Sequence, residues 1–351
     1  MSSTAGTPRH FAAADFDYRY PPELIAQHPA PERGGDRLLV LERSTGTITH
    51  RMFRDLPELV RDGDVLVVNR SRVIPARLHA IRDNGRPAEL LLVHAEPDGT
   101  WLAMVHPGGK LKAGRRVRFG DDARAEIVDV VGGGLRRVRF SGALDVHGVM
   151  ERYGSVPLPP YITHAPDAED AERYQTIYAR DEGSVAAPTA GLHFTEEIFE
   201  RVRARGAEIA ELVLHVGPGT FKPVEVDDPE AHTMHAEWYA VPDEAAAAVN
   251  RAKARGGRVW AVGTTSARVL ETVGQDDGTV RAGSGWTDLF IHPPFTFRVV
   301  DALLTNFHLP RSTLLMLVAA FAGYEHTMAA YRTAVAERYR LYSYGDAMAI
   351  V

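Results

Sequence analysis

The chain has 351 residues, of which 45% are hydrophobic and 25% charged, a composition typical of a globular protein of about two domains. It contains no cysteine, which excludes disulfides and thiolate metal sites. The formal net charge of −6 argues against a generic nucleic-acid binder. Because neither a signal peptide nor an apolar run of membrane-spanning length is visible, we expect a cytoplasmic protein that does not associate with a membrane.

The charge is unevenly distributed along the chain. Residues 70–140 hold 14 Lys and Arg against 8 Asp and Glu, whereas the remaining residues hold 26 against 38. A basic segment on an acidic body suggests one surface that faces a polyanion, although ordinary variation in surface charge explains it equally well.

The first elements in chain order are a helical PPELIAQ segment (21–27) and a β-hairpin over 36–53, in which LLVL and ITHRMF flank a Ser-Thr-Gly turn. From residue 64 to 142, short alternating runs are separated by NG, DG, GG and GD turns. This spacing, without a helical period, predicts a small β-barrel between about residues 70 and 148.

After Tyr153 and a proline-rich PLPPYI segment, helices and strands alternate. The predicted helices cover 195–206, 242–256, a start at 263, 312–323 with Ser312 as the cap, and 327–339; the predicted strands cover 207–216, 258–262, 287–291 and 302–307. The fold class is therefore α/β, with a main α/β domain (1–69 and 149–351) and an inserted small β-barrel domain (70–148). The alternative is two consecutive domains with the hairpin belonging to the barrel.

Five polar clusters follow predicted strands, at 69–77, 187–195, 214–224, 262–268 and 303–313. Ligands of open α/β sheets bind outside the carboxyl ends of the strands, so we expect several of these clusters to form one site. In the fourth cluster, threonine hydroxyls and helix amides suit a carboxylate or phosphate with an arginine clamp; an ordinary threonine N-cap is the competing explanation. The substrate-binding candidates are Thr189, Gly191, Gly217, Thr220, Thr264, Thr265, Arg268, Asn306, Ser312 and, near the C-terminus, Asp346.

Histidines in or near these clusters are candidates for acid–base catalysis, since imidazole exchanges protons near neutral pH. They are His193, His215, His232, His235 and His308, and each taken alone is more often structural. His232, His235 and Glu237 also suggest a metal site. The HExxH spacing is absent, however, and we expect no metal.

Basic side chains at the domain junction and within the barrel are candidates for phosphate contacts with a nucleic acid. They are Arg70, Arg72 and Arg77 at the junction, and Lys110, Lys112, Arg115 and Arg116 in the barrel. Solvation of an ordinary surface is the competing explanation.

Taken in order, many segments resemble the S-adenosylmethionine:tRNA ribosyltransferase-isomerase family of the queuosine pathway. They include FDYRYPPELIAQHP, GDVLVVNRSRVIPARL, YGSVPLPPYI, GSVAAPTAGLHFT, HVGPGTFKPV, HTMHAEWY, GTTSARVLE, TNFHLPRSTLLMLVAAFAG and YSYGDAM. The resemblance spans nearly the whole chain, and the barrel contributes least to it. PPFTF (293–297) stands where the family more often has a Pro-Gly-Tyr turn.

The resemblance implies that the ribosyl part of S-adenosylmethionine is transferred to 7-aminomethyl-7-deazaguanine in the tRNA anticodon, giving epoxyqueuosine and releasing adenine and methionine. S-adenosylmethionine is then a substrate, no cofactor or metal is required, and the tRNA anticodon stem-loop is the partner of what we expect to be a monomer. The sulfonium acidifies the C5′ protons, so one of the five histidines is expected to act as base and another to protonate adenine. The other classes considered are a noncatalytic RNA-binding module and a metal-dependent hydrolase.

Overall fold

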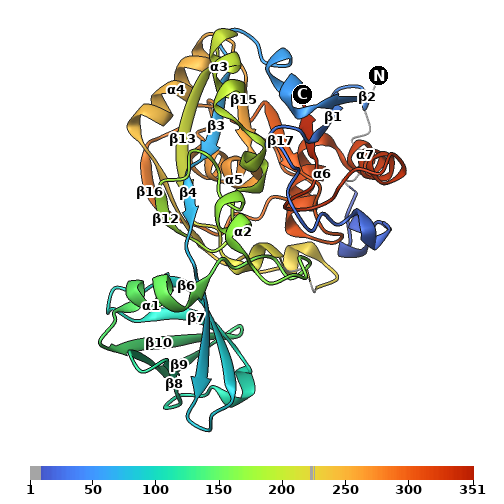
Figure 1. Cartoon of the computed structure of the whole chain (residues 1–351). Coiled ribbons are helices and arrows are strands. Elements are labelled where there is room, and N and C mark those ends of the chain that lie inside the picture. Colours follow the sequence, from blue (N-terminus) through green and yellow to red (C-terminus); the bar gives the residue numbers. More distant parts are fainter. Residues whose placement is uncertain (1–8, 222–223, 225) are drawn as a thin grey trace.

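The computed structural model describes residues 9–221, 224 and 226–351, and it is a mixed α/β structure with a large and a small lobe (Figure 1). Each lobe is built on its own sheet, and a short parallel pair, β4 (Ser71–Val73) with β12 (Asp181–Ser184), lies between them. The described helices include none long and apolar enough to cross a membrane.

The large lobe is organised by a nine-stranded sheet of order β16-β14-β13-β3-β15-β17-β18-β1-β2. Its strands are β1 Arg37–Leu41, β2 Ile48–Met52, β3 Val65–Asn69, β13 Glu208–Leu214, β14 Glu237–Val241, β15 Val259–Val262, β16 Gly283–Thr287, β17 Ala302–Asn306 and β18 Ala347–Ile350. Strands β13, β3, β15 and β17 are mutually parallel, so their carboxyl ends lie at one edge of the sheet.

Both faces of this sheet are covered, because alternate residues of a strand point to opposite faces. Val65 and Val67 pack among helices α4, α5, α6 and α7, whereas Leu66 and Val68 pack among residues of α3 and the 3₁₀ turn Phe53–Glu58. The helices are α3 Glu196–Ala204, α4 Asp243–Ala254, α5 Gly263–Val273, α6 Thr313–Ala322 and α7 Tyr324–Ala336. Continuous burial of β3 is the pattern expected of a central parallel strand.

The small lobe contains an antiparallel sheet of order β11-β5-β6-β7-β10-β9-β8, in which β8 pairs in addition with β5. Its elements are β5 Arg77–Arg82, β6 Pro87–Ala95, β7 Trp101–His106, β8 Arg116–Phe119, β9 Ala123–Gly132, β10 Leu135–Gly142, α1 Val146–Tyr153 and β11 Gly154–Ser155. It encloses a hydrophobic cluster of its own.

Several predicted elements are confirmed. The hairpin forms as β1 and β2, and it belongs to the nine-stranded sheet beside β18, so the alternative that assigned it to the barrel is wrong. Ser312 caps α6 by accepting a hydrogen bond from a backbone amide, as predicted, and Thr195, the first residue of the predicted helix 195–206, caps α3 in the same way. The last helix, α7, starts three residues earlier than predicted.

Two predicted elements are wrong. Residues 21–27 form only the 3₁₀ turn Pro22–Leu24, because the Leu24 carbonyl and the Ala26 amide bind the backbone of Leu341 instead of continuing a helix. Of the predicted strand 287–291 only Thr287 is in a strand, because its hydroxyl accepts from the Leu289 amide and turns the chain away from β16. The short helix α2 (Ala168–Arg173) was not predicted.

Candidate functional site

A cavity lies at the carboxyl edge of the parallel strands, where polar clusters were predicted to meet. Residues 187–190, Val216, 263–265 and 305–309 line it, so four of the five clusters contribute. We call it the central cavity. The fifth cluster does not line it: Asn69, at its start, instead binds the backbone of Leu214 with both ends of its amide and ties β3 to β13.

The N-terminus of α5 forms one wall of the central cavity. The Val262 side chain provides no cap, so the first-turn amides of α5 remain available to a ligand. Gly263 has φ +90, a backbone conformation that glycine adopts without strain. Thr264 and Thr265 both line the cavity, and the buried hydroxyl of Thr265 has no hydrogen-bond partner among the described residues.

Asn306, at the end of β17, offers a hydrogen-bond acceptor, whereas the α5 amides are donors. Its amide nitrogen lies 3.0 Å from the Tyr342 carbonyl oxygen and 3.3 Å from Nε2 of His193, while its buried Oδ1 has no partner among the described residues. Nδ1 of His193 lies 2.7 Å from Oδ2 of Asp36, and both residues are buried. Asn306 lines the cavity, and a buried acceptor without a partner among the described residues is a candidate to receive a hydrogen bond from a ligand.

Of the five candidate histidines, all of which the structure describes, His308 is the one that lines the central cavity. Burial lowers the pKa of His308 to about 3, so its ring is unprotonated at neutral pH. Nε2 lies 2.7 Å from the Thr305 hydroxyl, and that hydroxyl also lies 3.2 Å from the Asn306 carbonyl oxygen, to which it can donate.

The remaining histidines occupy other places. His215 contacts the Ser71 hydroxyl through Nδ1 and stacks on Trp238, and burial lowers its pKa. The ring of His232 packs against Phe290, and burial followed by the neighbouring His235 lowers the pKa of His232.

A second pocket of about 330 Å³ lies between the lobes. Gly217 and His235 from the large lobe line it, opposite residues of β6 and β7. We call it the interlobe pocket. Its rim includes Trp286, which is 54% exposed and whose ring lies against His94. The loop 216–219 touches both pockets, since Val216 lines the central cavity and the next three residues line the interlobe pocket.

Arg268, predicted as a charge clamp, is buried and turned away from the central cavity. Its Nη1 lies 2.5 Å from Glu237 Oε2, and its Nε donates to the Leu289 carbonyl. Glu237 also accepts from the Gly217 amide through Oε1. This buried ion pair joins β14 to α5. Because both carboxylate oxygens of Glu237 already accept hydrogen bonds, neither is available to a metal ion.

Some of the other substrate-binding candidates line the central cavity and others do not. Thr189 and Ser312 line the central cavity. Gly191 does not; a Cβ there would lie 2.0 Å from the Tyr178 hydroxyl, so the glycine serves close packing. Asp346 accepts from two backbone amides, of Arg37 and Arg340, and burial raises its pKa. The backbone of Thr220 lies in the 3₁₀ turn Pro218–Phe221, and its side chain falls outside what the structure describes.

The predicted phosphate-binding cations form two groups. Four are paired with carboxylates: Arg70 with Asp181 and Glu211, Arg72 with Glu182, Arg77 with Glu89, and Arg116 with Glu126. Lys110, Lys112 and Arg115, in the β7–β8 connection, are exposed and form no ion pair with the described residues. These three are the cations that remain free for a polyanion.

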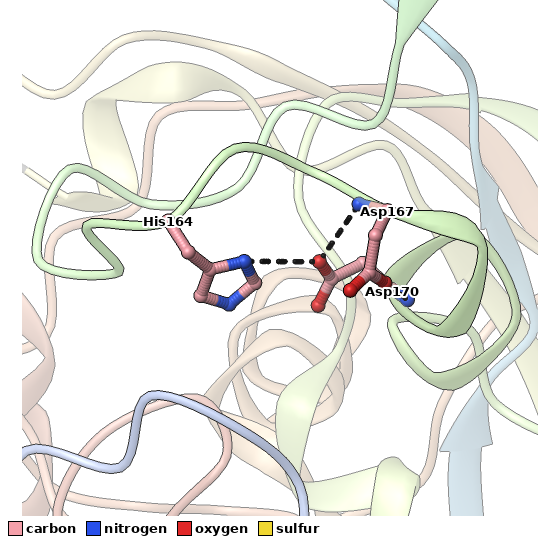
Figure 2. A group of neighbouring side chains, drawn as sticks. All are labelled: His164, Asp167 and Asp170. Carbon is pink, nitrogen blue, oxygen red and sulfur yellow. Dashed lines mark hydrogen bonds and ion pairs between the residues drawn. The ribbon is translucent and has the colours of Figure 1, made fainter.

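Figure 2 shows one His-Asp group whose ligand atoms lie close enough together to hold a metal ion, and within the described residues it is the only such group. It consists of His164, Asp167 and Asp170. Asp167 and Asp170 form a reciprocal capping box at the start of α2, and Asp170 also accepts from the Tyr344 hydroxyl. These contacts explain the carboxylates as helix caps. The alternative group of two histidines and Glu237 does not assemble.

Asp36 was missed by sequence reasoning, and no local signal marks it. It is a single aspartate immediately before β1, and its partner His193 is 157 residues away. The rings of Tyr161 and Tyr342 pack together at the central cavity.

The parallel strands, their loops and the cavity define an α/β enzyme with its ligand site at the carboxyl edge of the sheet. Residues 13–350 match the model of the queuosine biosynthesis protein family, and the chain belongs to that family. Curated relatives named S-adenosylmethionine:tRNA ribosyltransferase-isomerase include those of Thermus thermophilus, 54% identical over 96% of this chain and 98% of the relative, and Symbiobacterium thermophilum, 53% identical over 96% and 99%. A crystal structure of the S-adenosylmethionine tRNA ribosyltransferase of Thermotoga maritima is 41% identical, covers 96% of this chain and 100% of that one, and has a TM-score of 0.56.

Proposed function

We propose that this chain transfers and isomerises the ribosyl moiety of S-adenosylmethionine onto 7-aminomethyl-7-deazaguanine at the wobble position of tRNA. The observation that carries the proposal is the central cavity, whose lining residues include Thr265 and Asn306; the buried Thr265 Oγ1 and Asn306 Oδ1 have no hydrogen-bond partner among the described residues. A noncatalytic RNA-binding module would not need such a cavity in the lobe that lies away from the basic segment.

S-adenosylmethionine is the ligand we assign to the central cavity, where it is consumed as a substrate. A base removes a C5′ proton beside the sulfonium and leaves an ylide; adenine then departs from the sugar, the aminomethyl nitrogen attacks, and methionine is released. Thr189, Thr264, Thr265, Asn306 and Ser312 all line the cavity and are the residues we expect to contact this substrate.

His308 is the residue we propose as the base. Its location in the cavity places a ring nitrogen near the substrate, and its low pKa keeps the lone pair free at neutral pH. Burial also makes this imidazole a weak base, so the acidity of protons beside the sulfonium must supply the remaining driving force. The same low pKa means that His308 is unprotonated in the resting enzyme, so the only proton it could give to adenine is the one it has taken from C5′.

The small lobe is the proposed tRNA-binding part. Its additional β5–β8 pairing would complete a ring of six strands, which supports a closed β-barrel domain at 70–148 inserted into the α/β domain. The three unpaired cations, Lys110, Lys112 and Arg115, lie on this lobe and are suited to sequence-independent phosphate contacts. The interlobe pocket would then lie between the bound RNA and the cavity.

The experiment that tests the function is incubation of the protein with S-adenosylmethionine and an anticodon stem-loop bearing 7-aminomethyl-7-deazaguanine. We expect adenine release together with the corresponding ribosyl-derived gain in RNA mass. Folded protein that binds both substrates but yields neither product would contradict the proposal.

A further inference from the structure

The hydrogen bonds around Asn306 determine which way its side-chain amide points. The Tyr342 carbonyl oxygen accepts hydrogen bonds and cannot donate, so the atom 3.0 Å from it must be the amide nitrogen. The second amide hydrogen then faces Nε2 of His193, which must present its lone pair. Oδ1 is therefore the atom of Asn306 that remains for a ligand.

Asp36 completes this arrangement from the other side of the imidazole. Because Nε2 of His193 accepts, the ring hydrogen is on Nδ1 and is donated to Asp36 Oδ2 at 2.7 Å. A hydrogen on Nε2 instead would face the amide hydrogens of Asn306. The buried carboxylate thus selects the tautomer of His193, and the tautomer selects the orientation of Asn306.

The central cavity is small and uncharged. Its volume of about 50 Å³ holds about four water molecules, so only one part of S-adenosylmethionine can lie inside it and the rest of the molecule must extend outside. No charged side chain is among the described residues that line it, and the rings of Tyr161 and Tyr342 form part of the wall. An ammonium or a carboxylate would find no counter-charge from a side chain there.

We propose that Asn306 Oδ1 accepts a hydrogen bond from the exocyclic amine of a purine, and that Asp36 and His193 are positioning residues that hold Asn306 in this orientation. The inference rests on the proposed function, in which the purine is the adenine of S-adenosylmethionine. The α5 amides across the cavity are donors suited to ring nitrogens. A 6-oxo purine presents an acceptor where adenine presents a donor, so the site discriminates against it.

The test compares binding of S-adenosylmethionine and its 6-oxo analogue, S-inosylmethionine, to the full-length protein by titration calorimetry. We expect the wild-type protein to bind the adenosyl compound about 100-fold more tightly, because the analogue sets one acceptor against another. Asn306→Ala should reduce this ratio to about fivefold or less. Asp36→Asn, whose amide no longer requires a hydrogen on Nδ1 of His193, should reduce the ratio about tenfold.

Two matched variants control for loss of structure alone. Asn250→Ala removes an amide that binds the Val280 backbone far from the cavity, and Asp301→Asn alters a carboxylate that supports β15; both should keep the wild-type ratio. A fold defect weakens both ligands together and leaves the ratio unchanged. If Asn306→Ala does not fold, the wild-type ratio and Asp36→Asn still test the proposal.

Equal binding of the two compounds to the wild-type protein would overturn the inference, as would an unchanged ratio in Asn306→Ala. Weaker binding of both compounds at a constant ratio would place Asn306 against the ribose or the amino acid and would also overturn it. An unchanged ratio in Asp36→Asn would overturn the positioning role. A protein that neither binds S-adenosylmethionine nor releases adenine would instead contradict the proposed function.

Discussion

The two lobes differ in where their polar side chains lie. Around the central cavity, polar side chains are buried and held in fixed networks, and the described lining residues carry no charge. In the small lobe, β8 alternates buried Val117 and Phe119 with exposed Arg116 and Arg118. The first arrangement suits precise recognition of a neutral ring, whereas the second leaves basic side chains on the surface, as the proposed binding of RNA phosphates requires. The overall charge of −6 hides this division.

The largest effect should come from the edge of the large-lobe sheet opposite the cavity. Asp64, before β3, is buried and accepts from the Arg61 and Arg258 amides, the Arg258 guanidinium and the Trp260 indole. Burial opposes its ionisation, but these hydrogen bonds outweigh burial and lower its pKa.

Asp64→Asn should lower the free energy of unfolding by about 3 kcal/mol, because it breaks a buried hydrogen-bonded ion pair and leaves the partly buried Arg258 guanidinium without its counter-charge. Urea denaturation measures this, with the exposed neighbour Asp62→Asn as control. KM for S-adenosylmethionine should stay unchanged in the folded variant. A stable Asp64→Asn protein would show that charge burial in the large lobe is not important for its stability.

His308→Gln tests whether the cavity of the large lobe is the site of chemistry. We expect kcat to fall about 100-fold with stability near that of the wild type, since a proposed proton-transfer group is lost. Single-turnover adenine release measures the effect, and His50→Gln, which removes a ring that contacts Tyr339 away from the cavity, is the control. Full activity in His308→Gln would require another base.

The stability of the wild-type protein should decrease as the pH falls from about 6.5 towards 3. In this window the unfolded chain protonates His308, whereas the folded protein, in which the pKa of His308 is about 3, does not. The contribution of this group is at most about 1.4 kcal/mol per pH unit. Denaturation midpoints measured from pH 7 to pH 4 should show a shallower slope in His308→Gln, and equal slopes would contradict the burial of a neutral imidazole.

A triple variant tests whether the positive charge of the small lobe contributes to tRNA binding. It combines Lys110→Glu, Lys112→Glu and Arg115→Glu. We expect tRNA affinity to fall about tenfold or more at low salt, with a shallower salt dependence and unchanged binding of S-adenosylmethionine. The matched control reverses three exposed arginines at the amino ends of parallel strands, Arg61, Arg205 and Arg255. If the control weakens tRNA binding as much as the test variant, the small lobe is not the binding surface.

The smallest effect is expected at the group in Figure 2. Asp167→Ala removes a helix cap and should cost about 1 kcal/mol of stability, because Asp170 retains its contact with Tyr344. Activity should not respond to EDTA in either protein. Loss of activity on chelation that Asp167→Ala reproduces would show that the group binds metal.

Local signals predicted much of this structure. The cap at Ser312 and the turn between β1 and β2 are determined by neighbouring residues, and the convergence of loops follows from the parallel order of the strands. Strand β18, a four-residue segment AMAI, gave no signal of its own because it is stabilised by pairing with distant strands on both sides.

The candidate site was predictable in position but not in detail. Arg268 occupies a helix position suited to binding an anionic ligand group. Its guanidinium instead forms an ion pair with Glu237, 31 residues earlier in the sequence. Asp36 is the reverse case, an unremarked residue that becomes part of a network through His193. Both outcomes depend on which side chains meet across the folded chain, and residue spacing does not contain this information.

The position of β18 has a consequence for how the protein is made. β18 lies between β17 and β1, and it ends one residue before the end of the chain. The strand pairs of the small lobe are local in sequence, so this lobe can fold while the ribosome is still translating. The large sheet can close only after β18 has been synthesised, because β18 fills the place between β17 and β1; until then the edges of both strands are exposed to aggregation.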